Sequence, residues 1–401
     1  MFNSRHRPPN RVLSVIIPVR NGAGTIGRLL GKLLRQQQPT GWETEIVVGY
    51  QQSSDDTLSI LEQYHQNAAV KVVPCAGEGP SANRNAAVQQ SRGELLYFID
   101  ADAVPIEDEF FVRLIDAAGQ CEESGKRPAD KIPARSASEE SVSPGASLAL
   151  RAGLCGNPRT MGLRSRRLGA HLSDDGLGGP SYGMSPAPAP TKPGVSRSFS
   201  FGGLGGPILI DPAQRNNPVA LADHYACWFD WHAHRRSGES FFQPTVHLLV
   251  PRAVFDAVGG FDERLRVLED FDFECRIKDL GLKIYFDQTV PIAHEARGSL
   301  FNSWRHSWYW GRPAREQFYQ RVDHSYRFAD RPRLFWLNLP RLYWRRLHVV
   351  AAAAAAHSKW RAFYCLPFLA ATVFAWALAA AVGRTQPPAD SQHEKKRRAA
   401  A

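Results

Sequence analysis

The sequence predicts an α/β fold in which a mostly parallel sheet is flanked by helices. Apolar strand segments at 12–19, 45–49, 70–73 and 95–99 alternate with helical segments that begin near residues 25, 57 and 80. Strands that alternate with helices along a chain form parallel sheets with right-handed crossovers. The chain has 401 residues, 43% of them hydrophobic, which is enough for one large domain or two ordinary ones.

The first strand and the first helix carry clear local patterns. Residues 12–19 are rich in β-branched side chains, which favour the extended backbone of a buried strand. A turn follows at 20–22, and Thr25 can cap the next helix. From residue 26 to residue 34 the apolar side chains recur at helical spacing, so we expect one face of this helix to pack on the sheet.

Two aspartates follow the fourth strand. Residues 95–99 are all apolar or aromatic, and Asp100 and Asp102 come next, separated only by Ala101. Residues i and i+2 of an extended segment point the same way, so both carboxylates can reach one point. Such a pair at the carboxyl end of a buried strand suits a hard divalent cation that also binds phosphate. A solvated turn is the alternative interpretation of this short motif.

Charge and cysteine usage argue against several kinds of site. The net charge is +10, but much of the excess lies near the C-terminus beside an apolar segment, a pattern typical of contact with anionic lipid. No nucleic-acid-binding motif is present, so we expect no nucleic-acid partner. The six cysteines include no C-x-x-C pair, which argues against zinc and against a disulfide framework.

The composition of the chain changes at about residue 121. Residues 121–200 are rich in Ser, Pro, Gly, Ala and Arg and have no sustained apolar period, so we expect a largely disordered insertion. Periodic patterns return after it, with a predicted helix at 221–234 and a predicted strand at 246–250. The insertion therefore separates two ordered halves.

Three acidic residues, Glu269, Asp270 and Asp272, cluster at the start of a helix in the second half. Carboxylates in the first turn are stabilised by the helix dipole, so a charged helix start would explain the pattern without any function. A carboxylate near a substrate hydroxyl can instead act as a general base. The local pattern leaves both interpretations open.

The C-terminal part contains an uncharged run that is long enough to cross a bilayer. It covers residues 362–383, with Trp360 and Arg361 at one edge and Arg384 at the other, where interface anchors occur. The apolar stretch 347–356 is too short to span alone and could be interfacial, re-entrant or half of a hairpin. The alternative for 362–383 is a buried helix of a soluble domain.

A dinucleotide-binding fingerprint also occurs, since Gly22, Gly24 and Gly27 match G-x-G-x-x-G between a strand and a helix. This would suggest an NAD-dependent oxidoreductase. Two observations count against it: the second strand does not end in the acidic residue that would hold the ribose, and Pro18 and Asn21 disturb the tight turn.

Six short motifs, taken together, resemble family 2 glycosyltransferases. They lie in the family's order at 15–21, 53–57, 83–87, 98–102, 258–262 and 268–272, within a resemblance that covers 12–120 and 202–312. The resemblance implies a GT-A fold and a nucleotide-sugar donor. It also implies Mg²⁺ or Mn²⁺ as cofactor and sugar transfer to a hydroxyl with inversion at the anomeric carbon.

The family pattern assigns roles to nine residues of this chain. It places Pro18, Asn21, Asp55, Arg84 and Asp100 at the donor, Asp100, Asp102 and His294 at the metal, and Asp270 as catalytic base with Glu269 beside it. The usual aspartate after the second strand is missing at 49–52, so the nucleobase stays open. The Gln-x-x-Arg-Trp motif of processive synthases is absent, so we expect one sugar per encounter.

The sequence therefore predicts a membrane-associated glycosyltransferase whose catalytic domain faces the cytoplasm, where sugar nucleotides occur, with a glycan or lipid-linked acceptor and membrane lipid as a partner. A catalytically inactive scaffold or sugar-nucleotide sensor is the main alternative. The expected segments are a donor half at 12–120, the insertion at 121–200, an acceptor half at 201–330, a membrane-associated helical segment at 331–384 and a basic tail at 385–401.

Overall fold

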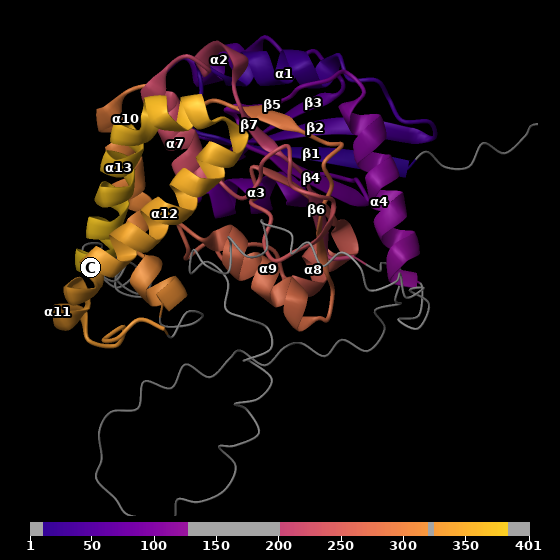
Figure 1. The fold of residues 1–401 in the computed structure, drawn as a ribbon. Helices are drawn as coiled ribbons and strands as arrows, with labels where there is room; N and C mark the ends of the chain where they lie inside the picture. The colour runs from indigo at the N-terminus through magenta and orange to yellow at the C-terminus, as the bar shows by residue number, and fades with distance from the viewer. Residues whose placement is uncertain (1–10, 127–200, 320–324, 384–401) are drawn as a thin grey trace, which may run out of the picture.

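The computed structural model describes residues 11–126, 201–319 and 325–383. An eight-stranded sheet runs through its centre in the order β3-β2-β1-β4-β9-β6-β10-β8, with helices on both faces (Figure 1). Its strands are β1 (Arg11–Val19), β2 (Trp42–Gln51), β3 (Val70–Cys75), β4 (Leu95–Ile99), β6 (Gly203–Gly205), β8 (Gly238–Ser240), β9 (His247–Pro251) and β10 (Ile284–Phe286). The predicted α/β class is confirmed.

The two halves of the sheet differ in strand direction. Strands β3, β2, β1 and β4 are all parallel, as the alternation of strands and helices predicts. Strand β9 then runs antiparallel to both β4 and β6, and β10 is parallel to β6 but antiparallel to β8. Because parallel strands end at the same edge, the loops after β1, β2 and β4 gather at one side of the sheet.

Two apolar cores hold the helices against the sheet. On one face, α1 (Ile26–Leu34) and α4 (Phe110–Lys126) pack on side chains of β1 and β4. On the other face, α3 (Pro80–Gln89), α8 (Arg252–Val258) and α9 (Glu269–Asp279) cover the alternate side chains of the same strands. Because successive side chains of a strand point to opposite faces of the sheet, alternate residues of the same strands contribute to the two cores. The short helix α2 (Thr57–Glu62) follows β2.

A layer of helices stands beside the sheet (Figure 1). It contains α7 (Pro218–Trp228), α10 (Leu300–Gly311), α12 (Leu339–His357) and α13 (Lys359–Val382), with the short α11 (Pro332–Phe335) before α12. Helices α12 and α13 pack against each other and meet at Ser358, so residues 347–356 form half of a hairpin, one of the predicted alternatives. Helix α13 also packs on α7 and α10.

Helix α7 differs from its predicted bounds of 221–234. It begins earlier because the side chain of Asn217 accepts the backbone N–H groups of Val219 and Ala220, and Pro218 stands at the first turn. It ends at Trp228, since the chain then turns and buries Trp231 in the core around β4. Tertiary packing therefore overrides the apolar period at this helix end.

A second sheet of three strands was not predicted. It contains β5 (Ala103–Pro105), β11 (Ile292–His294) and β7 (Ile208–Ile210), in the order β5-β11-β7. Helix α4 continues to Lys126, beyond the predicted start of the insertion at residue 121. The rest of that segment, at 127–200, and the predicted basic tail, at 385–401, lie outside the described residues.

Candidate active site

A cavity of about 1080 Å³ opens at the carboxyl edge of the parallel strands. Eight of the nine predicted site residues line it: Pro18, Asn21, Arg84, Asp100, Asp102, Glu269, Asp270 and His294. They come from both halves of the chain, and the two that are farthest apart in sequence are Pro18 and His294. The fold thus brings together motifs that are remote in sequence.

A buried arginine joins the two halves of the site. Arg84, in α3, donates from one guanidinium nitrogen to Asp100 and from another to Glu269, each at 2.8 Å. The side chains of Arg84 and Glu269 are only 3% and 7% exposed. Burial lowers the pKa of Arg84, but the charges of Asp100 and Glu269 outweigh this effect and raise it. Arg84 therefore fixes Asp100 relative to the start of α9.

Asp270 has the properties of a general base. It is 5% exposed, and its Oδ1 accepts the N–H of the next residue, Phe271, at 2.8 Å. Burial, and next the nearby charge of Glu269, raises the pKa of Asp270 to about 7. A base with a pKa near the working pH transfers protons well. Burial also raises the pKa of Glu269, but its carboxylate is bound to Arg84, which leaves Asp270 as the available group.

The backbone at the start of α9 is strained. Leu268 adopts φ 60°, in the left-handed region that a branched non-glycine side chain rarely occupies. Residues held in such conformations concentrate at functional sites. Here the strained turn directs the next two residues, Glu269 and Asp270, toward the cavity that they line.

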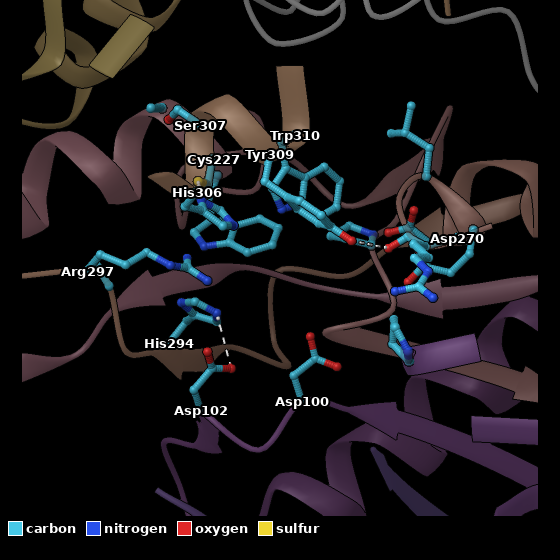
Figure 2. Close-up of a pocket in the computed structure, with 18 of the residues that line it drawn as sticks. Asp100, Asp102, Cys227, Asp270, His294, Arg297, His306, Ser307, Tyr309 and Trp310 are labelled. Atoms are coloured by element: carbon cyan, nitrogen blue, oxygen red, sulfur yellow. Dashed lines mark hydrogen bonds and ion pairs between the residues drawn. The ribbon is translucent and has the colours of Figure 1, made fainter. Parts of the chain in front are cut away.

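His294 and Asp102 meet because two short strands are paired. Strand β11 runs antiparallel to β5, so His294 lies opposite Ala103, next to Asp102, and the N–H of Glu295 donates to the Asp102 carbonyl at 2.9 Å. The Nε2 atom of His294 is 3.4 Å from Asp102 Oδ1. Figure 2 shows Asp100 and Asp102 along one wall, with His294 and Arg297 on the side of Asp102 and Asp270 across the cavity.

These side chains fit a hard divalent cation. The Asp100 and Asp102 side chains remain about one-third exposed, at 34% and 35%, so carboxylate oxygen is available to the cavity. Burial disfavours ionisation of Asp102, but His294 and next Arg297 outweigh it and hold its pKa below the ordinary value. The buried Nδ1 of His294 has no hydrogen-bond partner among the described residues. Their assignment as metal ligands stays a prediction.

Pro18 and Asn21 form the wall at the end of β1. Asn21 has φ 52°, a left-handed conformation that asparagine adopts more readily than most residues. Its side-chain oxygen accepts the N–H of Ser54 at 2.8 Å, and its own N–H donates to Ser53 Oγ at 2.9 Å. The loop after β1 is therefore fastened to the loop after β2.

Asp55 is the one predicted donor residue that does not line the cavity. Its Oδ2 accepts the N–H of Ala23 at 3.1 Å, and its Oδ1 accepts the N–H of Thr57 at the same distance. A hydrogen bond from the Thr57 hydroxyl lowers the pKa of Asp55. Loop donors thus bind both oxygens and fasten the loop after β1 to the start of α2, and the assignment of Asp55 to the donor stays a prediction.

Several lining residues were not singled out from the sequence as site residues. The ring of Trp228 lies 5.1 Å from that of His294, centroid to centroid. Arg297 follows β11, and its guanidinium lies 3.5 Å from Asp223 of α7. A polar run at the carboxyl end of a strand could have indicated Arg297. The position of Trp228 could not be read from local pattern, because it depends on how α7 packs.

The N-terminal part of the chain, which contributes Pro18, Arg84 and both aspartates to the site, matches a known protein family. Residues 14–128 match the model of the family described as glycosyl transferase family 2. This stretch is a family 2 glycosyltransferase sequence. The family 2 region contains both aspartates and Arg84, whereas Asp270 and His294 lie beyond the matched residues.

Curated relatives match over less than a quarter of this chain. The chain is 38% identical over 91 residues to the poly(ribitol-phosphate) beta-N-acetylglucosaminyltransferase TarS of Staphylococcus aureus, covering 22% of this chain and 16% of TarS. It is 34% identical over 93 residues to a poly(ribitol-phosphate) beta-glucosyltransferase of Bacillus spizizenii, covering 22% and 14%. Glycosyltransferase AglE of Haloferax volcanii is 33% identical over 96 residues, covering 23% and 31%. The matches thus span less than a third of each relative.

Solved structures with a similar arrangement include two glycosyltransferases. One is the mannosyltransferase PcManGT of Pyrobaculum calidifontis with GDP-Man and Mn²⁺, at 16% identity and a TM-score of 0.46, covering 92% of this chain and 86% of that one. The other is residues 1–349 of S. aureus TarS with UDP-GlcNAc, at 15% identity and a TM-score of 0.40, covering 96% and 92%.

Proposed function

We propose that this protein is a metal-dependent, inverting glycosyltransferase that moves one sugar at a time from a nucleotide-sugar donor to a hydroxyl acceptor. The Asp100–Arg84–Glu269 bridge is the observation that carries this proposal, because it fixes the donor motif of the family 2 region relative to Asp270. In this assignment Asp270 takes the proton of the acceptor hydroxyl as the oxygen attacks the anomeric carbon.

The leaving nucleoside diphosphate develops negative charge, which must be stabilised in the transition state. Asp100 and Asp102, with His294, would hold Mg²⁺ or Mn²⁺ there, and the bound cation would neutralise the diphosphate. Pro18 and Asn21 shape the nucleotide side of the cavity, and Asp55 keeps their loop in place. Trp228 forms an apolar part of the cavity wall and Arg297 a cationic part, and these parts would face an acceptor or a diphosphate.

The oxidoreductase alternative meets a specific obstacle. A dinucleotide pyrophosphate binds the free backbone N–H groups of the glycine-rich turn. Here the N–H of Gly22 donates to Thr57 Oγ1 at 2.8 Å, and that of Ala23 donates to Asp55. These donors are occupied within the protein, which favours the glycosyltransferase proposal. An inactive scaffold or sensor would keep the donor site without turnover.

The first test of the donor site is nucleotide binding by calorimetry. We expect UDP or GDP to bind in the presence of Mn²⁺, and we expect Asp102→Asn to weaken this binding at least about tenfold because a ligand carboxylate is lost. Asp108→Asn is the matched control, because the Asp108 side chain is exposed and forms a surface ion pair with Lys32 at 3.6 Å. Equal affinity with Mn²⁺ and with EDTA, or an unchanged Asp102→Asn variant, would contradict the assignment.

We also propose that the helical layer attaches the catalytic domain to the cytoplasmic face of a membrane, near a glycan or lipid-linked acceptor. Among the described helices, α13 alone is long and apolar enough to cross a bilayer, and half of its most apolar window is buried against its neighbours. Its other residues include Trp360, Phe363 and Phe374, which are 73%, 71% and 43% exposed. Exposed aromatic side chains of this kind suit a lipid interface.

Membrane fractionation tests this attachment. We expect the chain to sediment with membranes and to need detergent for release, and we expect Phe363→Asp with Phe374→Asp to move it toward the soluble fraction, since charge in hydrocarbon is costly. Leu280→Asp is the control, because Leu280 is 51% exposed but follows α9 in the catalytic domain. Release of the unmodified chain by a salt wash alone would contradict insertion of α13.

A further inference from the structure

A compact group of three side chains of types that bind metals lies beside another part of the cavity, which two of them, Cys227 and His306, line. Asp223 and Cys227 are four residues apart on α7, which places them on one helix face, and His306 belongs to α10. One ligand atom from each lies within 4.8 Å of the other two, and Cys227 Sγ is 3.8 Å from His306 Nδ1. Figure 2 shows Cys227 and His306 together, away from Asp100.

The carboxylate of this group has an unused oxygen. The Asp223 side chain is 1% exposed, and its Oδ1 accepts no hydrogen bond from any described residue. Its Oδ2 accepts the backbone N–H of Arg297 at 3.1 Å and lies 3.5 Å from the guanidinium. A buried carboxylate oxygen without a partner is costly, so Oδ1 is poised for a ligand that this part of the chain does not supply.

We propose that Asp223, Cys227 and His306 bind a zinc ion in this wall, distinct from the cation expected at Asp100 and Asp102. Zinc accepts sulfur, imidazole nitrogen and carboxylate oxygen together, whereas Mg²⁺ and Ca²⁺ prefer oxygen alone. On binding, the Cys227 thiol loses its proton to solvent, and one thiolate with one carboxylate balances the charge of Zn²⁺. Arg297 keeps its contact with Oδ2.

The geometry gives the ion a structural role and an open position. Because Asp223 and Cys227 lie on α7 and His306 on α10, the zinc ion links two helices that both pack on α13. Three protein ligands leave the fourth position of a tetrahedral zinc ion for water or substrate. Cys227 and His306 line the cavity, so water can reach this position from the cavity.

The sequence contains no C-x-x-C pair, and this absence counts only against zinc sites whose ligands are neighbours in the sequence. Here two ligands have helical spacing and the third lies 79 positions beyond Cys227. The site becomes visible only when α7 and α10 are placed side by side. It is independent of the proposed reaction, because its measurement needs neither donor nor acceptor.

Metal analysis of the purified full chain tests this proposal. We expect about one zinc per chain after dialysis, and we expect Cys227→Ala and His306→Ala each to bind zinc at least about tenfold more weakly. Cys275→Ala is the matched control, because Cys275 is another half-buried free cysteine, in α9. Co²⁺ added to the metal-free wild type should give a thiolate-to-cobalt absorption band that persists in Asp102→Asn.

The outcomes separate this site from the donor site. A cobalt thiolate band that disappears in Cys227→Ala but remains in Cys275→Ala supports the proposal. Wild-type protein that binds no zinc, or a band that persists without Cys227, overturns it whatever the nucleotide-binding result. The cobalt measurement on the wild type keeps the test decisive if a variant fails to fold.

Discussion

Replacing Asp270 with Asn lowers the kcat/KM of sugar transfer by about 10²- to 10⁴-fold and leaves nucleotide binding unchanged, because the variant keeps the shape of the side chain but cannot take a proton. The measurement is release of nucleoside diphosphate with the donor and acceptor that the wild type uses. Asp272→Asn is the control: the same change on the same helix removes only a partly exposed pair with Arg276, at 3.0 Å. Full activity in Asp270→Asn would disprove the base assignment.

The pH dependence provides an independent signature of the same residue. Since the pKa of Asp270 is raised to about 7, wild-type kcat/KM should fall as the pH drops below about 7, and the residual rate of Asp270→Asn should lack this step. A raised carboxyl pKa also means that the contribution of Asp270 to stability falls as the pH rises from about 4 to about 7. The Tm of Asp270→Asn should therefore exceed that of the wild type, and this difference should be larger at pH 8 than at pH 5. A variant that is both more stable and inactive cannot be explained by unfolding.

Replacing Arg84 with Met destabilises the fold by about 3–5 kcal/mol, because Glu269 then keeps a buried charge without its partner. The free energy of unfolding from urea titration measures this loss. Arg92→Met is the control, since the Arg92 side chain is 64% exposed and pairs with Glu43 at the surface, where such pairs contribute at most about 1 kcal/mol.

A double variant distinguishes the lost charge pair from lost packing. Arg84→Met combined with Glu269→Gln removes both buried charges and should recover part of the stability that Arg84→Met loses. The single variant and the double variant should both bind the nucleotide-sugar donor more weakly than the wild type, because in both Asp100 has lost the guanidinium that holds it. A cost below about 1 kcal/mol for Arg84→Met would show that the bridge between the two halves does not hold the site together.

The sequence by itself determined the elements whose signals are local. Apolar runs and helical periods predicted strands β1 to β4 and the helices between them, because each pattern matches the period of the structure that buries it. The same reading found the two aspartates after β4, the acidic start of α9 and the apolar helix α13. Family resemblance then joined these motifs into one expected site, and the fold places eight of its nine residues around one cavity.

Only the tertiary structure decided which of those groups touch and what each can do. The contact of Arg84 with Glu269 spans 185 positions, and no local pattern reports a pairing at that range. The same holds for the pairing of β5 with β11, which brings His294 to Asp102, and for the packing of α7 beside α10, which brings Cys227 to His306. Asp55 shows the converse, since its motif indicated the donor but neighbouring loop N–H groups occupy its oxygens. Local propensity indicates most of the secondary structure, whereas contacts between distant segments depend on how complementary surfaces pack, and no short stretch of sequence reports which distant surface it will meet.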